Sequence, residues 1–343
     1  MNKIGFGIIG SGSVSAHHIK SLFESTDGYL VGICSADKDT ARKLAEENGV
    51  LYFDSAENMI DCPDVDVVNI CTPSGTHADL AEKFLLAGKH VMIEKPVALT
   101  VEDAERVCRA AERNGKLCSV ISQLRFFESS KRIKQAVSSG LLGRITFASA
   151  YMKYYRSPEY YAAADWRGRW DTDGGLLMNQ GIHGIDLLRY LAGEVSAVSA
   201  ASRTLLHSIE ADDTTAALLE FESGAIGVTE GSTSVYPGYD LAIELCGTKG
   251  SVRLEGNSIV RWDVEGSSSL LSEEKNTVGS GTDPNAISHV GHLLQIDNMI
   301  RAIRGEESLV SDCESGKKTV ELISAIYRAA RESNRIILTD KKG

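Results

Sequence analysis

The first 24 residues combine a short apolar run, a glycine-rich turn and a helical pattern, and this order limits the possible folds more than any other feature. The run KIGFGII, residues 3–9, is apolar and rich in β-formers, as in a strand buried on both faces of a parallel sheet. Gly10-Ser11-Gly12-Ser13-Val14-Ser15 follows directly, and a helical pattern continues to about Glu24. A strand, a turn and a helix in this order begin a βαβ unit.

Further units of this kind fill the next hundred residues. Strands are expected at residues 29–34, 65–71 and 91–93, and helices at residues 40–48, 77–87 and 101–113. Strands that alternate with helices of this length imply right-handed crossovers and a parallel sheet. The sequence therefore predicts a Rossmann-type doubly wound α/β domain over residues 1–122.

The glycine turn has the residues that a dinucleotide requires. Gly10 can make the tight turn, Gly12 lets the backbone approach a pyrophosphate, and the small Ser15 permits close packing of helix on strand. The helix start then offers free N–H groups and a positive dipole end. We expect Gly10, Gly12, Ser13 and Val14 to bind cofactor; the alternative is a glycine-rich turn without a ligand.

The end of the second strand should carry the residue that reads the adenosine ribose. An acidic residue there would bond the 2′-hydroxyl, but this position holds Ser35, with Ala36 and Asp37 after it. Ser35 can donate to a phosphate, and the nearest basic residues are Lys38 and Arg42. The cofactor is therefore NAD or NADP, with the choice between them left open.

Length and charge narrow the remaining possibilities. A chain of 343 residues exceeds the usual size of one hydrophobic core, so a second domain is expected over residues 123–343. The net charge of −11 argues against binding to nucleic acid or an anionic membrane, so a small molecule is the expected partner. Neither a leader pattern nor an apolar run long enough for a membrane span is seen, which predicts a cytoplasmic protein.

The seven cysteines are scattered and never in C-x-x-C spacing. This distribution signals neither a disulfide framework nor a zinc site, so most cysteines should be reduced and buried, and no metal site is expected.

The pattern changes after Gly143. Short strands are expected at residues 144–155, 197–206, 214–221, 225–232, 240–246 and 251–254. Closely spaced strands with tight turns favour an α+β domain with a large, mostly antiparallel open sheet, one face of which a helix over Met178–Leu191 can cover. Two tail helices, at residues 288–303 and 314–331, complete the chain; the last can pack back on the first domain, and His292 is expected on a helix surface.

Four separated motifs resemble one dehydrogenase family. They are the glycine turn, TPSGTH at residues 72–77, GKHVMIEKP at residues 88–96 and GIHGID at residues 181–186. In this order they are similar to the family of glucose–fructose oxidoreductase and inositol dehydrogenase (Gfo/Idh/MocA). The resemblance implies an NAD(P)-dependent dehydrogenase acting on CH–OH groups, and a homodimer or homotetramer formed through the second-domain sheet. It also implies cofactor contacts by Thr72, Pro73, His77 and Glu94.

Lys95 is the first catalytic candidate. The resemblance implies that it lies between nicotinamide and substrate, and its position agrees, because the C-terminal edge of a parallel strand faces the crevice where ligands bind. Near a positively polarised nicotinamide its pKa is expected to fall, which makes Lys95 a usable acid or base.

The segment MNQGIHGID, residues 178–186, supplies the other candidates. Asn179 and His183 are four residues apart and would share one face of a helix. The family usually has Asp where this chain has Asn179, and an amide cannot relay a proton, although it can bond a sugar hydroxyl and orient His183. Base duty then falls to His183 or Lys95, while Asp186 is expected to be structural. This variant of the motif resembles members that act on nucleotide-linked amino sugars and sugar acids.

Tyrosines, tryptophans and arginines gather at residues 154–170, as stacking on a carbohydrate and recognition of carboxylate or phosphate would require. We expect Tyr155 and Arg156 to bind substrate and Trp166 and Arg167 to lie at the cofactor; a subunit contact is the alternative. Two residues of the segment SQLRF should border the same crevice and bind substrate, namely Gln123 and Arg125.

The sequence thus predicts an NAD(P)-dependent oxidoreductase that moves a hydride between nicotinamide and a ring carbon of a sugar, cyclitol or nucleotide sugar. Reduction of a keto-sugar by the same residues is the alternative within catalysis. A dinucleotide-sensing regulatory protein without catalysis is the alternative outside it.

Overall fold

The computed structural model describes residues 2–269, 271 and 288–338, and the chain divides into two compact units. Unit 1 comprises Met1–Gln123 and His289–Lys318, and unit 2 comprises Leu124–Ser288 and Thr319–Gly343. The segment 289–318 thus belongs to the first unit, although the sequence pattern alone places it with the second domain.

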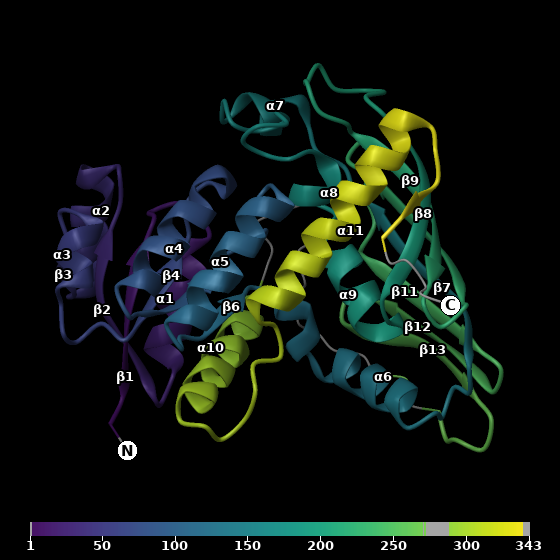
Figure 1. The fold of residues 1–343 in the computed structure, drawn as a ribbon, viewed down its shortest axis with the longest axis horizontal. Coiled ribbons are helices and arrows are strands. Elements are labelled where there is room, and N and C mark those ends of the chain that lie inside the picture. Colours follow the sequence, from purple (N-terminus) through teal and green to yellow (C-terminus); the bar gives the residue numbers. More distant parts are fainter. Residues whose placement is uncertain (1, 270, 272–287, 339–343) are drawn as a thin grey trace. The chain divides into compact units, whose positions relative to one another are not determined.

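Unit 1 is built on a six-stranded parallel sheet with the strand order β3-β2-β1-β4-β5-β6 (Figure 1). The strands are β1 Ile4–Ile9, β2 Gly28–Cys34, β3 Leu51–Tyr52, β4 Val67–Ile70, β5 His90–Ile93 and β6 Cys118–Val120. The helices are α1 Ser15–Glu24, α2 Lys38–Asn48, α3 Ala56–Ile60, α4 His77–Leu86, α5 Val101–Arg113 and α10 Val290–Ile303, with the 3-10 turn η1 Ser74–Thr76. The predicted doubly wound α/β fold is confirmed.

The core of unit 1 explains why residues 289–318 belong to it. Phe6, Ile8 and Ile33 on the central strands form a buried cluster that also takes in Ile296 and Ile300 of α10. Since α10 buries its apolar face in this cluster, it completes the first unit although it lies far along the chain.

Unit 2 contains an eight-stranded sheet with the order β13-β12-β11-β7-β10-β9-β8-β14. The strands are β7 Ile145–Lys153, β8 Val195–Arg203, β9 Thr214–Phe221, β10 Ile226–Ser232, β11 Ala242–Gly247, β12 Gly250–Glu255, β13 Ser258–Val264 and β14 Ile336–Ile337. The named strands pair antiparallel except β7 with β10, which run parallel. The mostly antiparallel sheet is therefore confirmed.

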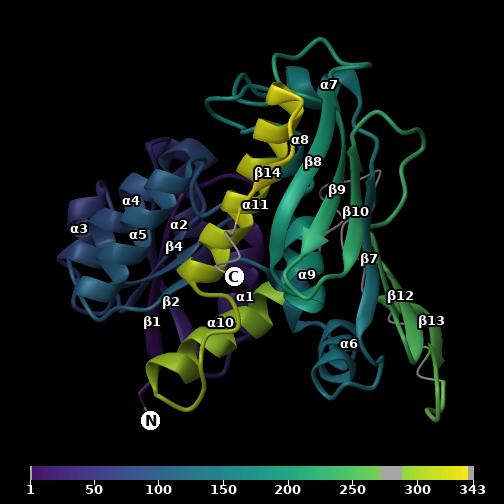
Figure 2. The same ribbon diagram turned by 45° about the vertical axis from the view of Figure 1, so that its right-hand side comes forward.

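Helices cover one face of this sheet, as Figure 2 shows for α8 and α9. Unit 2 contains α6 Glu128–Ser138, α7 Pro158–Ala162, α8 Leu176–Asn179 and α9 Ile182–Ala192, while α11 Cys313–Glu332 begins in unit 1 and ends in unit 2. Gly184 lets α9 approach β7 closely, because a Cβ there would lie 2.3 Å from the sulfur of Met152.

The single helix predicted over Met178–Leu191 is wrong, because the chain breaks it into α8 and α9. The amide of Gly181 bonds the carbonyl of Leu176, five residues back, and a new helix then starts from the Gly181 carbonyl. Asn179 therefore ends one helix and His183 lies in the first turn of the next.

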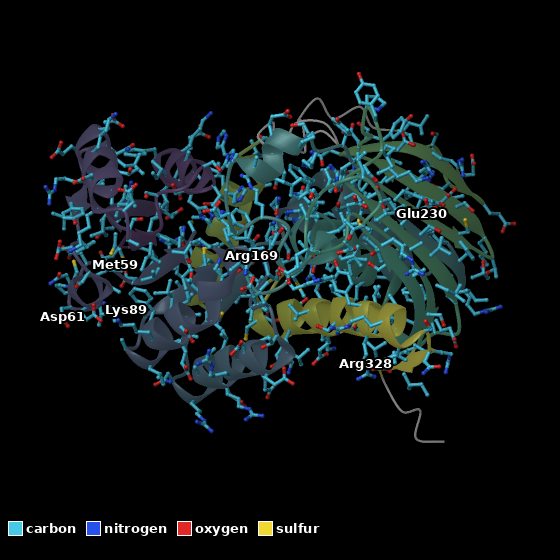
Figure 3. All side chains as sticks on the ribbon, turned by 90° about the horizontal axis from the view of Figure 1, so that it is seen from above. Met59, Asp61, Lys89, Arg169, Glu230 and Arg328 are labelled. Carbon is cyan, nitrogen blue, oxygen red and sulfur yellow. The ribbon has the colours of Figure 1, made fainter. Side chains whose placement is uncertain are left out.

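The opposite face of the sheet keeps exposed side chains along its central strands. Phe147, Leu218 and Ile226 are 40%, 45% and 49% exposed, and Ile226 pairs directly with Phe147 across β7 and β10. Glu230 of β10, labelled in Figure 3, pairs there with Lys153 at 2.9 Å. This face is apolar at the centre with charges beside it.

Two simpler expectations concern cysteines and membranes. All seven cysteines are unpaired thiols and five are buried, as predicted. Among the described residues, no helix is both long and apolar enough to cross a membrane.

Candidate active site

The glycine turn between β1 and α1 has the backbone that a pyrophosphate requires. Gly10 has a φ of 113°, and a Cβ there would lie 2.4 Å from the carbonyl oxygen of Cys71, so a side chain is excluded both by conformation and by space. Ser15 is buried and its Oγ donates to the Gly12 carbonyl at 2.5 Å, which closes the turn against the start of α1.

The same turn leaves space for a ligand. A Cβ built on Gly12 meets no atom within 4 Å, so the loop is open where a pyrophosphate would approach its backbone. The first N–H groups of α1 lie directly after it, at the positive end of the helix. The residues present therefore fit a dinucleotide, held by the backbone of Gly10–Val14.

At the end of β2, where the ribose of a dinucleotide is expected, unit 1 has hydroxyl groups in place of an acidic residue. The Ser11 hydroxyl donates to the Ser35 hydroxyl at 2.9 Å. The carboxylate of Asp37 instead caps α2, where it accepts from the amide of Thr40 at 3.1 Å and from its hydroxyl at 2.7 Å. Asp37, the first acidic residue after β2, therefore caps a helix. The hydroxyls of Ser11 and Ser35 lie where a residue that binds the ribose is expected.

His77 joins the two loops that follow β4 and β5. Its ring is buried, with Nδ1 lying 2.7 Å from the carbonyl oxygen of Pro96 and Nε2 lying 2.8 Å from that of Thr72. Burial lowers the pKa of His77, against the effect of these two carbonyls. His77, which the sequence predicts to contact the cofactor, therefore contacts the backbone of both loops. The loop after β4 also includes Pro73.

Lys95 is the second residue after β5, at the edge of the sheet where the parallel strands end. It is partly exposed, and its amide donates to the carboxylate of its neighbour Glu94 at 3.3 Å. The Glu94 side chain itself is buried and turned toward His18 and His292. Lys95 is therefore placed at the ligand edge of the sheet, whereas Glu94 serves the interior behind it.

In unit 2, the short helix that ends at Asn179 is fixed at its start. The Asp212 carboxylate accepts from the amide of Leu176 at 3.0 Å and from the hydroxyl of Tyr327 at 2.9 Å, and that hydroxyl accepts from the amide of Leu177. Gly175 must be glycine, because its φ is 85° and a Cβ would lie 2.6 Å from the Asp212 carboxylate. These contacts fix the direction in which α8 presents Asn179.

Tyr160 is the centre of a polar cluster next to Asn179. Its hydroxyl accepts from the side chain of Gln180 at 2.6 Å and is also hydrogen-bonded to Asn179. The guanidinium of Arg167 lies 4.1 Å from the ring centre and donates to the Tyr160 carbonyl at 2.6 Å. Arg156 donates to Gln180 at 2.8 Å. We call these five residues the Tyr160 cluster: Arg156, Tyr160, Arg167, Asn179 and Gln180.

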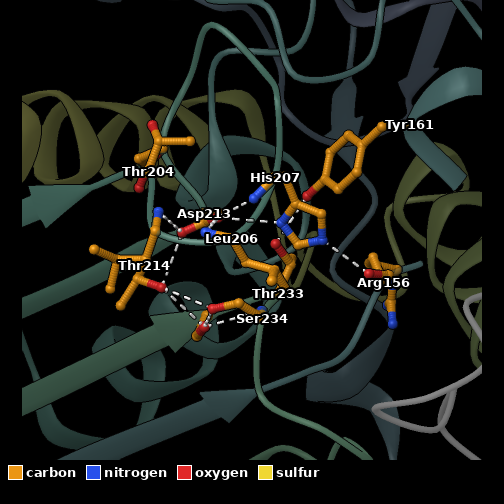
Figure 4. Close-up of polar contacts among 12 residues, drawn as sticks. Arg156, Tyr161, Thr204, Leu206, His207, Asp213, Thr214, Thr233 and Ser234 are labelled. Atoms are coloured by element: carbon orange, nitrogen blue, oxygen red, sulfur yellow. Dashed lines mark hydrogen bonds and ion pairs between the residues drawn. The ribbon is translucent and has the colours of Figure 1, made fainter. Parts of the chain in front are cut away.

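A second polar group, drawn in Figure 4, holds the loop that carries Arg156. The Nε2 atom of His207 lies 2.9 Å from the Arg156 carbonyl oxygen, and its Nδ1 lies 3.1 Å from the carboxylate of Asp213. Asp213 is fully buried and accepts the amides of Leu205, Leu206 and His207. The Arg156 backbone is thus held by a buried network.

Arg125 and Gln123 lie in the interior. Arg125 is 2% exposed and donates through two nitrogens to Asp186, which also accepts from Thr319. The prediction that Asp186 is structural is confirmed. Gln123 is 4% exposed, with its Oε1 atom buried and without a hydrogen-bond partner. Arg125 therefore serves the packing of α9, and the contacts of Arg125 and Gln123 with substrate stay predictions.

The predicted residues therefore fall into two groups. The ends of parallel strands in unit 1 collect Gly10, Gly12, Ser13, Val14, Ser35, Thr72, Pro73, His77, Glu94 and Lys95. Unit 2 contains Tyr155, Arg156, Trp166, Arg167, Asn179 and His183; Trp166 lies beside Arg167, and the Tyr155 ring packs edge-on against Tyr236. Tyr160, Gln180 and His207 were missed; the first two lie within motifs already singled out, whereas no local signal marks His207.

Together, the fold and the glycine turn define a dinucleotide-binding oxidoreductase. Residues 4–122 match the family model of the oxidoreductase family with an NAD-binding Rossmann fold, and residues 130–253 match the GFO/IDH/MocA C-terminal domain. The chain belongs to the Gfo/Idh/MocA family of NAD-dependent sugar and cyclitol dehydrogenases.

Named relatives give the range of substrates. The WlbA dehydrogenase from Bordetella pertussis, solved with NADH and UDP-GlcNAcA, is 33% identical, with 99% of both chains covered and a TM-score of 0.90. Myo-inositol 2-dehydrogenase of Thermotoga maritima is 27% identical over 98% of this chain and 99% of its own length. Inositol 2-dehydrogenase 2 of Saccharopolyspora erythraea is 31% identical over 76% of each chain.

Proposed function

We propose that this dehydrogenase oxidises a ring hydroxyl of a nucleotide-linked sugar acid, with NAD as the hydride acceptor. Support comes from the 33% identity over the full chain to the WlbA dehydrogenase solved with NADH and UDP-GlcNAcA. The cationic Tyr160 cluster beside Asn179 agrees with an acidic substrate.

Three side chains divide the chemistry. Bound NAD would supply the acceptor for the hydride that leaves the ring carbon. Lys95 or His183 takes the proton of the reacting hydroxyl, since an amine and an imidazole both titrate within reach of neutral pH once placed in a site. Asn179 orients that hydroxyl through a hydrogen bond, because an amide can donate and accept but cannot carry the proton away.

The observation that carries the substrate class is the position of Arg167. Its guanidinium lies 4.1 Å from the ring centre of Tyr160 and 5.3 Å from that of Trp166, and none of the ion pairs among the described residues includes it. An arginine held flat by aromatic rings presents a rigid fork of donors, which matches a carboxylate or phosphate. We therefore assign Arg167, with Arg156 beside it, to the acidic group of the substrate, in place of the cofactor contact that the sequence predicts.

The experiment follows NADH formation with NAD and a panel of substrates. The panel contains UDP-GlcNAcA, the matching neutral UDP-sugar, the free sugar acid and myo-inositol. We expect turnover with UDP-GlcNAcA at kcat/KM at least tenfold above the neutral sugar, because a charged hydrogen bond is worth about 1.5–3 kcal/mol. A preference for myo-inositol or for the neutral sugar would contradict the assignment, and NADH binding without turnover of any alcohol would favour a sensor.

The oligomeric state is part of the same proposal. The central strands of the unit 2 sheet carry Phe147, Leu218 and Ile226 on the face opposite α8 and α9, all exposed. A contiguous apolar patch flanked by charges is typical of a subunit interface. We assign this face to a second copy of the chain, which gives a homodimer or homotetramer.

The oligomer is tested by light scattering. Ile226→Lys and Leu218→Glu should reduce the particle mass to that of one chain, while Val260→Lys, an exposed residue on β13 near the end of the sheet, should not. A wild-type protein that is monomeric at micromolar concentration would remove this part of the proposal.

We also propose a reducing, cytoplasmic location, which the seven unpaired cysteines support. Cell fractionation of a tagged chain tests it. Recovery of the protein with oxidised, disulfide-linked cysteines outside the cytoplasm would contradict it.

A further inference from the structure

Behind the loop that carries Lys95, three titratable side chains meet in the interior of unit 1. His18 comes from α1, Glu94 follows β5, and His292 comes from α10; they are 0%, 6% and 2% exposed. The Nε2 atoms of His18 and His292 lie 2.9 Å and 3.2 Å from the same Oε1 atom of Glu94. The chemistry proposed above uses none of these three side chains, which we call the buried trio.

The proton positions in the trio follow from its neighbours. Asn69 on β4 places its Nδ2 atom 2.9 Å from Nδ1 of His18. An amide nitrogen only donates, so Nδ1 accepts and the proton of His18 is on Nε2, where it donates to Glu94. His292 donates to the same oxygen from its Nε2 atom, because an ionised carboxylate only accepts.

The charge of the trio is also defined. Burial acts to raise the pKa of Glu94, but the hydrogen bonds from His18 and His292 outweigh it and hold that pKa well below its usual range. Burial lowers the pKa of His292, against its bond to Glu94. An anion bonded by two imidazole donors is the resulting state, and a buried charge persists only when it is bonded in this way.

Other titratable groups face the trio from each packed element. The ring of His17 on α1 stacks on His292 with ring centres 5.5 Å apart. Further groups that interact with Glu94 or His292 electrostatically include Cys71 after β4, His77 of α4 and His289 before α10.

Glu94 connects the trio to Lys95. Its second oxygen, Oε2, accepts the amide of Lys95 at 3.3 Å. One residue further on, the carbonyl of Pro96 lies 2.7 Å from the buried ring of His77. The backbone on both sides of the Lys95 side chain is therefore held by buried polar groups, and Glu94 is held in turn by two helices of the cofactor unit.

We propose that His18, Glu94 and His292 are positioning residues for Lys95, the two imidazoles fixing the Glu94 side chain and Glu94 fixing the backbone from which the Lys95 amine projects. This rests on the proposed role of Lys95 in proton transfer. Because the pyrophosphate loop leads directly into α1, the trio ties the cofactor loop and the Lys95 loop to one buried anion.

A metal ion is the competing occupant. The three ligating atoms all lie within 4.8 Å of one another, and two imidazoles with a carboxylate are a familiar zinc ligand set. Direct bonds from both rings to one carboxylate oxygen already satisfy these atoms, however, so hydrogen bonding alone accounts for the geometry.

The test compares two substitutions that differ in a donor. His292→Gln keeps an N–H group that can reach Glu94, and His292→Leu removes it. His289→Leu, three residues earlier, is the matched control, because His289 is bonded to the exposed Glu24 and acts on His292 through its charge and not through a hydrogen bond. We expect His292→Leu to lower kcat by on the order of tenfold while the NADH Kd stays within about threefold, and His292→Gln to recover most of kcat.

A second measurement, the titration of the Lys95 side chain, needs no substrate. The lysines are labelled by reductive ¹³C-methylation, the Lys95 signal is assigned with Lys95→Met, and it is titrated with NADH bound. We expect the midpoint in His292→Leu to differ from wild type by about half a pH unit or more, and His292→Gln and His289→Leu to match wild type.

The outcomes separate this inference from the proposed function. A wild-type protein that binds NADH but oxidises no substrate defeats the proposed function, and the Lys95 titration then decides the positioning role by itself. An unchanged Lys95 midpoint in His292→Leu overturns the inference, as does equal loss of NADH binding in both His292 variants. Stoichiometric zinc in the purified protein, removed by His292→Leu, would replace it with a metal site.

Discussion

The proposed cofactor site in unit 1 is built mainly from backbone, whereas the proposed substrate site in unit 2 is built from side chains. In unit 1, Gly10 and Gly12 shape a turn whose amides would bind the cofactor, and strand ends place Lys95. In unit 2, Tyr160 collects Arg167, Gln180 and Asn179 from separate segments. A cofactor common to a whole family can be bound by a common backbone, while a substrate that varies is read by exchangeable side chains.

The largest effect is expected from the two residues to which we assign the proton transfer, Lys95 and His183. Lys95→Met and His183→Ala should each lower turnover by on the order of 10² or more, because each removes a group that moves the hydroxyl proton. The NADH Kd, measured by fluorescence, should stay nearly unchanged. Near-wild-type turnover in both variants would remove these roles.

Substitutions of Gly10 and Gly12 test the proposal that unit 1 binds the cofactor through its backbone. Gly10→Ala should destabilise the protein by about 1–3 kcal/mol, since its Cβ meets the Cys71 carbonyl at 2.4 Å in a left-handed conformation. Gly12→Ala meets no protein atom, so it should leave the melting temperature unchanged and weaken NADH binding by on the order of tenfold. Equal effects of both substitutions on stability would show that Gly12 has a structural role.

The side-chain half is tested at Arg167. Arg167→Gln should raise KM for UDP-GlcNAcA by on the order of tenfold or more, because a charged hydrogen bond is lost, with little change in NADH Kd. Arg169→Gln is the control, since Arg169 is exposed and pairs with Asp171. If Arg167→Gln weakens NADH binding and leaves KM unchanged, Arg167 belongs to the cofactor half.

The smallest expected effect is the change with pH in the free energy of unfolding that His90 of unit 1 causes. Burial, with the charge of Lys116, lowers the pKa of His90 to about 4, and its Nδ1 accepts the amide of Leu117 at 3.0 Å. In the unfolded chain His90 is protonated below about pH 6.5, whereas in the native chain it is protonated only below about pH 4. The free energy of unfolding should therefore fall as the pH drops from 6.5 to about 4. After allowance for partial exposure the loss is roughly 1–2 kcal/mol.

The check for His90 is urea unfolding at several pH values. His90→Asn keeps an acceptor for the Leu117 amide but does not titrate, so its stability should depend less on pH over this interval than that of the wild type. Identical pH dependence in the two proteins would exclude His90 as the cause.

Features that depend on local sequence were predictable. Strand, turn and helix in the first unit follow from apolar runs and glycines, and α5 Val101–Arg113 and β9 Thr214–Phe221 have the bounds that periodicity predicts. Lys95 could be found because a strand end and a motif coincide. The structural role of Asp186 also followed from its place one turn beyond the catalytic segment.

Features that depend on tertiary contacts were not predictable. His292 looks like a helix-surface residue, yet it is buried because α10 docks on α1 and the core of unit 1. The break after Asn179 depends on a bond from the Gly181 amide to the Leu176 carbonyl, together with the close packing of α9 on β7. Arg125 pairs with Asp186, 61 residues away, and no sequence pattern reveals this pairing.

Our central proposal is that Lys95 of unit 1 and His183 of unit 2 serve the same proton transfer. A double-mutant cycle with Lys95→Met, His183→Ala and their combination, measured as the rate of NADH formation, tests it most directly. If the two groups act on one proton, the double variant should be no more than about threefold slower than the slower single variant. Losses that multiply in the double variant would show that the two residues act in separate steps.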